Sequence, residues 1–515
     1  METSRLAQAR IYERELLAHE RRPFRGPNAN VVVNARFRGV VSHEQLAAVV
    51  RKAQQRHALL NVRVELDRAG EARFTSEGAH EIPIKVIARR SDDQWIKTCL
   101  EEYRIPHEPE KRPPIRLLLL QGPEVSDLIV MCHHMLCDAL SLAYLARDVL
   151  QHLGNPQKTP ELLPDPPLAD KDNIPAQISG PLLARLSIGR LNAKWQQREV
   201  LFDREDYRNI FDAYWEHITP RAYALEFTPA QTSRLVARCR EENVTVNTAL
   251  LAALIAAQYA AQGDTAPYLR RVATAMDLRK HLVENPGESF GFYAGGVVLD
   301  VRYPPARPFW EFARELHHKL DRESKPKVVL SKILTFGYMA PTLYDGLMFK
   351  RYGKLVRPEQ SRYEKLSAFS ARRDALTAFI KARRQEQVRV GLVLSNLTRL
   401  DFPAHYGPLE LDKMMFLGAA TRSYQKAVGV VTVSGKLTMT VSYVEESLDS
   451  DTMAAFRTSL LDLLASQVGW QTGLVYGGDR SKRAVHSDKN GNHRRRVAAS
   501  TGAASRPLVR RSPRR

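Results

Sequence analysis

Residues 127–140, DLIVMCHHMLCDAL, decide how the rest of the chain is interpreted. The apolar run 128–131 is typical of a short buried strand, and it ends in a polar cluster of two histidines and an aspartate. Because side chains alternate across a strand, we expect His133 and His134 to point to opposite faces. Asp138 precedes the helical run 139–150 and is therefore a candidate N-cap.

The spacing of these residues leaves several interpretations open. A buried histidine with satisfied hydrogen bonds is the plain structural one, and a neutral imidazole that accepts a proton as a general base is the catalytic one. Zinc binding by Cys132, His133, His134, Cys137 and Asp138 is another, although no CxxC or HxxxH pair accompanies the cluster. A Cys137 nucleophile with His134 as its base depends on the turn between the two residues.

The segment 133–139, HHMLCDA, resembles the HHxxxDG motif of the chloramphenicol acetyltransferase-like superfamily. That superfamily includes nonribosomal-peptide condensation domains, alcohol acetyltransferases, wax ester synthases and polyketide-associated acyltransferases. Ala139 stands where the motif usually has glycine. A second segment, RHALLNVRVELD at 56–67, resembles the RHxxLR segment near the start of condensation-type domains.

Two strand ends in the second half extend the resemblance. The strand 272–280, VATAMDLRK, ends in an arginine, and the resemblance makes Arg279 the structural partner of the motif aspartate. Because His133 points away from the face of His134, we expect it to support the site structurally. The strand 388–396, VRVGLVLSN, resembles the SNxG strand end of alcohol acetyltransferase-like members, with Thr398 in place of glycine. It implies that Ser395 and Asn396 bind substrate and that the following segment crosses between two domains.

The length of 515 residues predicts two domains, and an apolar fraction of 44% allows both to be well buried. We expect an α/β fold with an N-terminal domain at 1–175 that carries the histidine motif, and a C-terminal domain at 176–475. The proline-rich segment 154–175 is the predicted linker. The resemblance implies two chloramphenicol acetyltransferase-like sandwiches in a V, with a tunnel at their junction that reaches His134 from both sides.

Hydrophobic patterns predict the individual elements. We expect helices at 1–18, 42–57 with Ser42 as cap, 228–243, 245–261 and 451–468, and a helical, basic region at 325–384. We expect strands at 30–37, 58–66, 84–87, 115–121 and 290–300, a strand near Tyr223, and a hairpin of 428–433 with 436–443.

The charge and cysteine content bound the protein's surroundings. Four cysteines without framework spacing favour a reducing compartment, and no apolar stretch is long enough to span a bilayer, so we expect a soluble, cytoplasmic protein. Half of the net charge of +20 lies in the predicted disordered tail 476–515, where residues 479–515 hold twelve Lys or Arg and two Asp. Contact of this tail with anionic surfaces is an alternative to a purely solvated tail, and no dedicated nucleic-acid module is present in the sequence.

The resemblance implies acyl transfer with His134 and Asp138 in the catalytic motif. His134 is the expected general base, and Asp138 the carboxylate that turns back toward Arg279. The expected donor is an acyl thioester, on coenzyme A or on the phosphopantetheine arm of a carrier protein, with no permanently bound cofactor or metal. An alcohol acceptor is favoured. A freestanding condensation domain that forms an amide, and a non-catalytic member that binds a carrier protein or lipid, are the alternatives.

Overall fold

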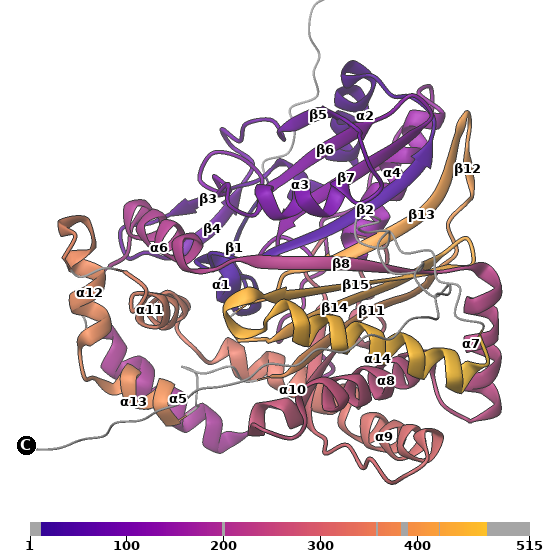
Figure 1. The fold of residues 1–515 in the computed structure, drawn as a ribbon. Coiled ribbons are helices and arrows are strands. Elements are labelled where there is room, and N and C mark those ends of the chain that lie inside the picture. The colour runs from indigo at the N-terminus through magenta and orange to yellow at the C-terminus, as the bar shows by residue number, and fades with distance from the viewer. Residues whose placement is uncertain (1–11, 198–200, 357–358, 383–389, 422, 471–515) are drawn as a thin grey trace, which may run out of the picture. The chain divides into compact units, whose positions relative to one another are not determined.

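The strand that carries the two histidines is β7, Val125–His133. It lies between β2 and β6 in a six-stranded sheet with the order β12-β13-β2-β7-β6-β5 and runs antiparallel to both neighbours. This central place confirms the prediction for the strand (Figure 1). The computed structural model describes residues 12–470 except 198–200, 357–358, 383–389 and 422. Residues 1–11 of the predicted first helix, and the predicted tail from 471 onward, lie outside these described residues.

The first sheet is covered differently on its two faces. Val33 and Val130 pack under α2 (His43–Arg56) and α4 (Ala139–Gly154), whereas Val32 and Met131 point to the opposite face and pack against α3 (Gln94–Glu102). Since alternate residues enter different cores, nearly all of β2 and β7 is buried. The other strands of this sheet are β2 Asn30–Arg38, β5 Ile84–Ala88, β6 Ile115–Gln121, β12 His405–Tyr406 and β13 Leu409–Gly418.

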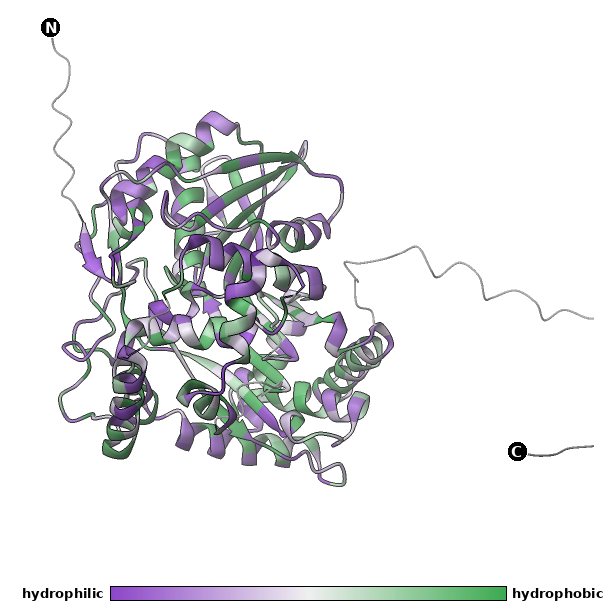
Figure 2. Ribbon diagram, turned by 90° about the vertical axis from the view of Figure 1, so that its left-hand side faces the viewer, coloured by the Kyte–Doolittle hydropathy of each residue, from purple (hydrophilic) through white to green (hydrophobic). Residues whose placement is uncertain are grey.

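The second six-stranded sheet has the order β10-β9-β11-β14-β15-β8. Its strands are β8 Pro220–Phe227, β9 Arg271–Asp277, β10 Ala294–Asp300, β11 Leu392–Leu400, β14 Lys426–Val433 and β15 Lys436–Val444. Its helices are α7 Pro229–Glu241, α8 Val246–Gln262, α9 Phe309–Glu323 and α14 Ser450–Val468. The apolar helix α8 packs against β11, α9 and α14, and Figure 2 shows apolar residues along the inner strands and hydrophilic residues on the outer faces of helices.

The strand β13 joins the two sheets. Along the chain it follows β11, which belongs to the second sheet, but its backbone pairs with β2 of the first sheet. The chain therefore crosses between the sheets after Asn396, as predicted. On the other edge of β13, the hydroxyls of Thr438, Thr440 and Ser442 in β15 donate to the carbonyls of every second residue from Met414 to Gly418. These side-chain bonds satisfy backbone acceptors that no neighbouring strand reaches.

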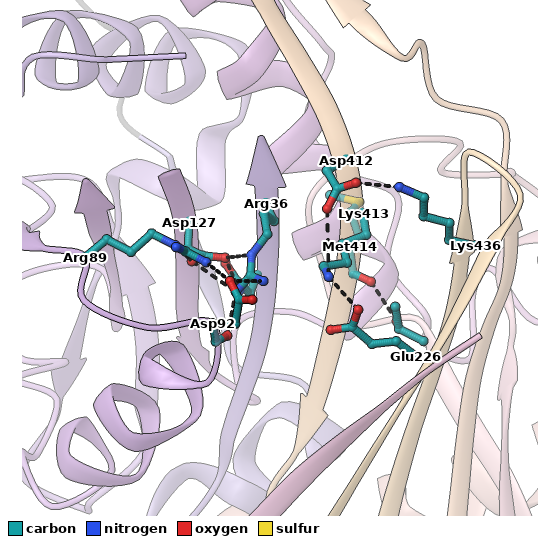
Figure 3. Close-up of polar contacts among 11 residues, drawn as sticks. Arg36, Arg89, Asp92, Asp127, Glu226, Asp412, Lys413, Met414 and Lys436 are labelled. Atoms are coloured by element: carbon teal, nitrogen blue, oxygen red, sulfur yellow. Dashed lines mark hydrogen bonds and ion pairs between the residues drawn. The ribbon is translucent and has the colours of Figure 1, made fainter. Parts of the chain in front are cut away.

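Ion pairs surround this junction. Figure 3 shows Lys413 of β13 beside Glu226 of β8, with Nζ 2.5 Å from Oε2. The same view shows the fully buried Asp127 of β7, which accepts from Arg36 Nε and Arg89 Nε at 2.8 Å each. A buried carboxylate needs such cations, because removing an unpaired charge from water costs on the order of several kcal/mol.

Five of the remaining helices, with side chains such as Trp195, Tyr214 and Phe349, form a third core against Val32 and Met131 of the first sheet. Val64 and Phe74 of a small sheet of order β1-β4-β3 instead pack in the core beneath α2 and α4. The strands are β1 Glu13–Glu15, β3 Arg63–Leu66 and β4 Ala72–Thr75. The remaining helices are α1 Ala18–Phe24, α5 Leu182–Gln196, α6 Arg204–His217, α10 Pro326–Gly337, α11 Pro341–Tyr352, α12 Glu364–Ala371 and α13 Ala375–Ala382. Short 3₁₀ turns lie at Ala58–Asn61, Pro267–Arg270, Arg279–His281, Ser361–Tyr363 and Glu445–Ser447.

Most predicted elements are present, with the following corrections. The helix expected at 1–18 is wrong for Glu13–Glu15, which is a strand paired with β4. The strand expected at 58–66 starts with the 3₁₀ turn Ala58–Asn61. The strand expected from Phe290 begins only at Ala294. The strand expected at 272–280 ends at Asp277, so Arg279 lies in a 3₁₀ turn, and the strand expected to end at Asn396 continues to Leu400. The caps Ser42 and Thr228 are confirmed, since each side chain accepts from a backbone N–H in the first turn.

The α/β architecture with two sheets is confirmed. The segment 155–181, which contains nearly all of the predicted linker 154–175, has no helix or strand, and the division into two domains stays a prediction. Within the described residues, no single helix is long and apolar enough to cross a membrane. The bent pair α7 and α8, at 98°, passes that test together by length and composition only.

Candidate active site

His134 lies in the turn that follows β7. Its backbone N–H donates to the Ala29 carbonyl at 2.6 Å, which holds the turn against the start of β2. Its ring Nδ1 lies 2.8 Å from the Cys137 carbonyl oxygen. A carbonyl can only accept, so Nδ1 carries the hydrogen and Nε2 carries the lone pair of the neutral ring. The local turn thus fixes the tautomer that a general base acting through Nε2 requires.

The surroundings of His134 keep its ring uncharged near neutral pH. Burial is the largest influence and lowers the pKa of His134, while the Cys137 carbonyl and the Asp138 carboxylate act in the opposite direction without cancelling it. The charge of Arg22 adds to the lowering. A neutral, half-buried imidazole with a defined lone pair is able to accept a proton from a bound hydroxyl or amine.

Phe292 and the helix α1 form one wall beside His134. The Phe292 ring lies 4.4 Å from the His134 ring, at an interplanar angle of 32°. On its other side, the His19 ring contacts Phe292 edge-on at 5.2 Å, and His19 Nε2 lies 3.2 Å from the Phe292 carbonyl. Arg22, in the last turn of α1, has its guanidinium 5.1 Å from the Phe336 ring. Sequence reasoning did not single out these residues.

Asp138 caps α4 and binds the second half of the chain. Its carboxylate accepts from the backbone N–H of Ser141 at 2.9 Å and of Tyr293 at 2.8 Å. Arg279 adds two bonds, from Nη1 to Oδ2 at 3.0 Å and from Nη2 to Oδ1 at 3.1 Å. Burial alone raises the pKa of Asp138, but Arg279 and the two N–H groups outweigh it and hold the pKa below its usual range. The predicted pairing of Asp138 with Arg279 is confirmed.

Ser141 completes this polar network. Arg279 Nη2 donates to the Ser141 hydroxyl at 2.7 Å, and that hydroxyl donates to the Gly291 carbonyl at 2.8 Å. The same carbonyl accepts from the Asp138 backbone N–H at 3.1 Å. The backbone near Gly291 therefore bonds to the start of α4, which explains why the strand β10 begins only at Ala294.

Two further groups contact Arg279. Asp277 Oδ1 accepts from Nη1 at 2.8 Å, and the guanidinium lies 4.7 Å from the Tyr293 ring. Asp277 has an exposed side chain, so Asp138 is the deeper of the two carboxylate partners. Arg279 is held on several sides and has no freedom to swing toward a substrate without breaking these bonds.

His133 has surroundings different from those of His134. It is buried, its Nδ1 accepts from the Met135 backbone N–H at 3.2 Å, and its ring lies 5.9 Å from that of His107 in a T-shaped contact. Burial lowers the pKa of His133 to about 3, with the nearby His134 as a smaller cause. The two adjacent rings thus occupy separate environments, as the strand alternation predicts.

The thiol and metal interpretations of the cluster receive no support. Cys137 is fully buried, and burial raises its pKa well above the usual value, which disfavours the thiolate that a nucleophile needs. In the described parts of residues 12–470, no group of three or more His, Cys, Asp or Glu side chains is arranged to hold a metal ion.

Ser395 and Asn396 lie in β11, beside Gly429 and Val430 of β14. The Asn396 side-chain oxygen accepts from the backbone N–H of Thr398 at 2.8 Å, and Thr398 adopts a positive φ of 62° where the compared motif has glycine. Among the described residues, no hydrogen bond or ion pair joins Ser395 or Asn396 to His134, Asp138 or Arg279. Their role in substrate binding stays a prediction.

Two cavities stand out in the described structure. One of about 540 Å³ is lined by residues of α6 and the loop 104–110, and the other of about 300 Å³ lies between the proline-rich linker and the loop 284–289. His134 lines neither of them, so the tunnel implied by the resemblance stays a prediction.

Comparisons with known proteins place the fold. No protein-family model and no curated protein matches this sequence. Among solved structures, the TRI3 trichothecene 15-O-acetyltransferase from Fusarium sporotrichioides is 12% identical, with a TM-score of 0.61 over 89% of this chain and 95% of that one. Polyketide synthase associated protein 5 from Mycobacterium tuberculosis is 15% identical, with a TM-score of 0.52 over 88% and 97%.

The condensation domain from the Monacolin K polyketide synthase MokA is 13% identical, with a TM-score of 0.52 over 89% of this chain and 98% of that one. At such identities the likenesses establish the fold alone. This chain has the fold of these acetyltransferase, polyketide-associated and condensation-domain structures, which is the fold that the HHxxxD resemblance predicts.

Proposed function

We propose that this protein transfers an acyl group from a thioester to an alcohol acceptor, with His134 as the general base. The observation that carries the proposal is the bond from His134 Nδ1 to the Cys137 carbonyl, which leaves the Nε2 lone pair available on a neutral ring. The likeness in fold to an O-acetyltransferase and to condensation domains supports acyl transfer as the reaction class.

The proposed step moves one proton and exchanges one bond. His134 Nε2 takes the proton of the acceptor hydroxyl while the hydroxyl oxygen forms a bond to the thioester carbonyl carbon, and the carbonyl electrons move onto its oxygen. When this tetrahedral intermediate collapses, the C–S bond breaks, and the thiolate receives the proton held on Nε2. His134 is neutral again at the end, so the reaction needs neither a covalent acyl-enzyme nor a bound cofactor.

Asp138 has a structural part in this proposal. Each carboxylate oxygen is occupied by Arg279 and by a backbone N–H, and the low pKa makes proton donation by Asp138 unfavourable. Asp138 fixes the first turn of α4 relative to the segment 291–293. Phe292, which packs on the His134 ring, belongs to that segment, so Asp138 positions the base through Phe292.

The proposed donor is acyl-coenzyme A or an acyl group on the phosphopantetheine arm of a carrier protein. The test is to incubate the purified full-length protein with a panel of both donor types and with alcohol or amine acceptors. Release of free thiol and the mass of the product are then measured. We expect acceptor-dependent thiol release and an ester product. An amide product with amines only would replace the ester proposal by the condensation alternative.

The variant that tests the proposed base is His134→Gln. The glutamine amide occupies the position of Nε2 but has no basic nitrogen, so this variant tests the proton transfer with little change in side-chain volume. We expect thiol release to fall to the background rate with this variant. Equal rates in the His134→Gln and unaltered proteins would show that His134 is not the base.

A further inference from the structure

The larger of the two cavities, of about 540 Å³, does not have His134 in its lining. It is within the size range of small-ligand sites. It borders His107, whose Nε2 bonds to the Asn30 side-chain oxygen at 2.9 Å and whose ring contacts His133 edge-on. Its lining residues are Arg104, Ile105, Pro106, His107, Glu108, Glu110, Arg204, Tyr207 and Arg208.

Glu108 contributes little free negative charge to this cavity. Its carboxylate already pairs with Lys111 at 2.7 Å, Arg112 at 3.4 Å and Arg204 at 3.3 Å. These cations lower the pKa of Glu108, led by the hydrogen bond from Lys111. One carboxylate shared by three cations leaves an excess of positive charge at this side of the cavity.

Two arginines in the lining, Arg104 and Arg208, carry positive charge that nearby carboxylates do not fully neutralise. Arg104 donates both Nη groups to the backbone carbonyls of Trp215 and Ile218, which are neutral, and has no carboxylate partner among the described residues. Arg208 pairs with Asp212 through Nε, at 3.0 Å and 3.2 Å, and its Nη groups make no bond within the described structure. The charge of Arg104 and the Nη groups of Arg208 therefore remain available to an anion.

A buried arginine lies next to the lining residues. Arg25 is buried to about 2% exposure, packs between the Phe24 and Tyr207 rings, and has its Nε and Nη2 groups without hydrogen-bond partners. Its nearest carboxylate is Glu110, 3.6 Å from Nη1, too long for a hydrogen bond, and Glu110 Oε1 is likewise unbonded. Such unbonded buried groups cost free energy that an additional anion would recover.

We propose that this cavity binds the phosphate group of an organic phosphate. Guanidinium groups match phosphate oxygens in charge and in paired geometry, and the cavity has room for a group attached to the phosphate. His107 is neutral, because burial lowers its pKa well below the usual value, so the arginines supply the charge. The phosphate belongs either to a thioester donor of the proposed reaction, in which case the site rests on that function, or to a separate ligand.

The experiment measures binding to the full-length protein by titration calorimetry, without turnover. The probes are adenosine 3′,5′-bisphosphate, phosphopantetheine and inorganic phosphate. We expect at least one organic phosphate to bind, and binding to weaken as salt concentration rises. Phosphopantetheine binding points to a thioester donor. Binding of the bisphosphate alone, which is also the nucleotide part of coenzyme A, points to coenzyme A or another nucleotide. Binding of inorganic phosphate alone, or of no probe, overturns the proposal.

Two variants and a control locate the site. Arg208→Glu and Arg104→Gln are expected to raise the Kd about tenfold or more, because each removes charge-assisted bonds. Arg322→Glu, on the exposed face of α9, alters a similar surface arginine far along the chain and is expected to leave the Kd unchanged. Arg208 is exposed and has one surface pair, so its variant keeps the fold, which thermal melts check.

The proposed acyl transfer and the proposed phosphate site can be contradicted independently of each other. The titration is repeated with His134→Gln protein, which lacks the proposed base but retains the cavity. Phosphate binding that depends on Arg208 in a protein without acyl transfer would support this site and contradict the proposed function. Acyl transfer with binding that is equal in the unaltered, Arg208→Glu and Arg104→Gln proteins would contradict this site and leave the proposed function in place.

Discussion

Arg279 donates two parallel hydrogen bonds to the Asp138 carboxylate, at 3.0 Å and 3.1 Å, although 141 positions separate the two residues. Both side chains are almost completely buried. The pair ties the first turn of α4, which follows the histidine motif, to the end of β9 in the second sheet. It is therefore the most direct polar link between the two sheets at the candidate active site.

Breaking this pair is expected to destabilise the protein. Asp138→Ala and Arg279→Ala should each lower the free energy of unfolding by about 3–5 kcal/mol, because each leaves an unpaired buried charge. The double variant should lose less than the sum of the two, since the second substitution removes the charge that the first one leaves unpaired. Denaturant unfolding of the three variants measures the coupling.

Asp277→Ala is the control for this cycle. Asp277 also bonds to Arg279, but its side chain is 38% exposed, and we expect a loss of about 1 kcal/mol or less. Strictly additive losses in the Asp138 and Arg279 variants would contradict a coupled pair. An Asp138→Ala protein with unchanged stability and no turnover would assign the aspartate to the chemistry instead.

The two histidines are expected to respond differently to removal. His134→Ala should reduce turnover by roughly 10²–10⁴-fold, the usual contribution of a general base, with a small loss of stability because the ring is half-buried. His133→Ala should lower stability by about 2 kcal/mol or more through loss of buried packing. Steady-state rates and unfolding curves of both variants separate the two effects. A stable, inactive His133→Ala protein together with an active His134→Ala protein would reverse the assignment.

Acid sensitivity should arise partly from His133. The folded protein lowers its pKa to about 3 from an ordinary value near 6.5, so below pH ~6.5 the unfolded chain binds a proton that the folded protein does not. Stability is therefore complete above that pH and falls as the pH decreases toward 3. The Asp138 contribution is lost only at lower pH, because its folded pKa lies below the usual 3.8.

The measurement is the melting temperature of the unaltered and His133→Asn proteins between pH 7.5 and pH 4. Asparagine still offers an acceptor to the Met135 N–H but does not titrate, so we expect a shallower decrease with this variant. His43→Asn, at an exposed position, should leave the decrease unchanged. Identical pH profiles for the unaltered and His133→Asn proteins would show that His133 does not contribute.

Much of the site could be predicted because its signals are local. The apolar run before His133 predicts β7, and the position of Asp138 before a helical run predicts its cap, which Ser141 confirms. The partner Arg279 came from the resemblance, since no local pattern relates positions 138 and 279. The order of short motifs along the chain was thus sufficient for the fold and for this pair.

The wall beside His134 could not be predicted in the same way. His19 and Phe292 are 273 positions apart, and their contact depends on how α1 packs against an irregular segment. The prediction that β10 begins at Phe290 is wrong for a related reason. Hydrophobic periodicity reports apolar patterns, but the backbone near Gly291 is bonded by Asp138 and Ser141, which a strand pattern does not reveal.

The last prediction concerns the place where β13 crosses the second sheet. A Cβ added to Gly429 in β14 would lie 2.2 Å from the carbonyl oxygen of Phe416 in β13. The obstructing atom belongs to the backbone, so β13 has to move. The same carbonyl accepts the Thr440 hydroxyl, so the movement also weakens a bond that joins the sheets.

Gly429→Ala is therefore expected to lower the free energy of unfolding by about 1–3 kcal/mol, the usual cost of forcing extra volume into a packed region. Gly189→Ala is the matched control, because a Cβ there meets nothing within 4 Å and alanine suits the exposed interior of α5. It should stabilise the protein by up to ~1 kcal/mol. Denaturant unfolding compares the two variants. If Gly429→Ala is as stable as Gly189→Ala, the two strands do not approach as closely as the structure shows, and the hydroxyl bonds from β15 do not hold β13 in place.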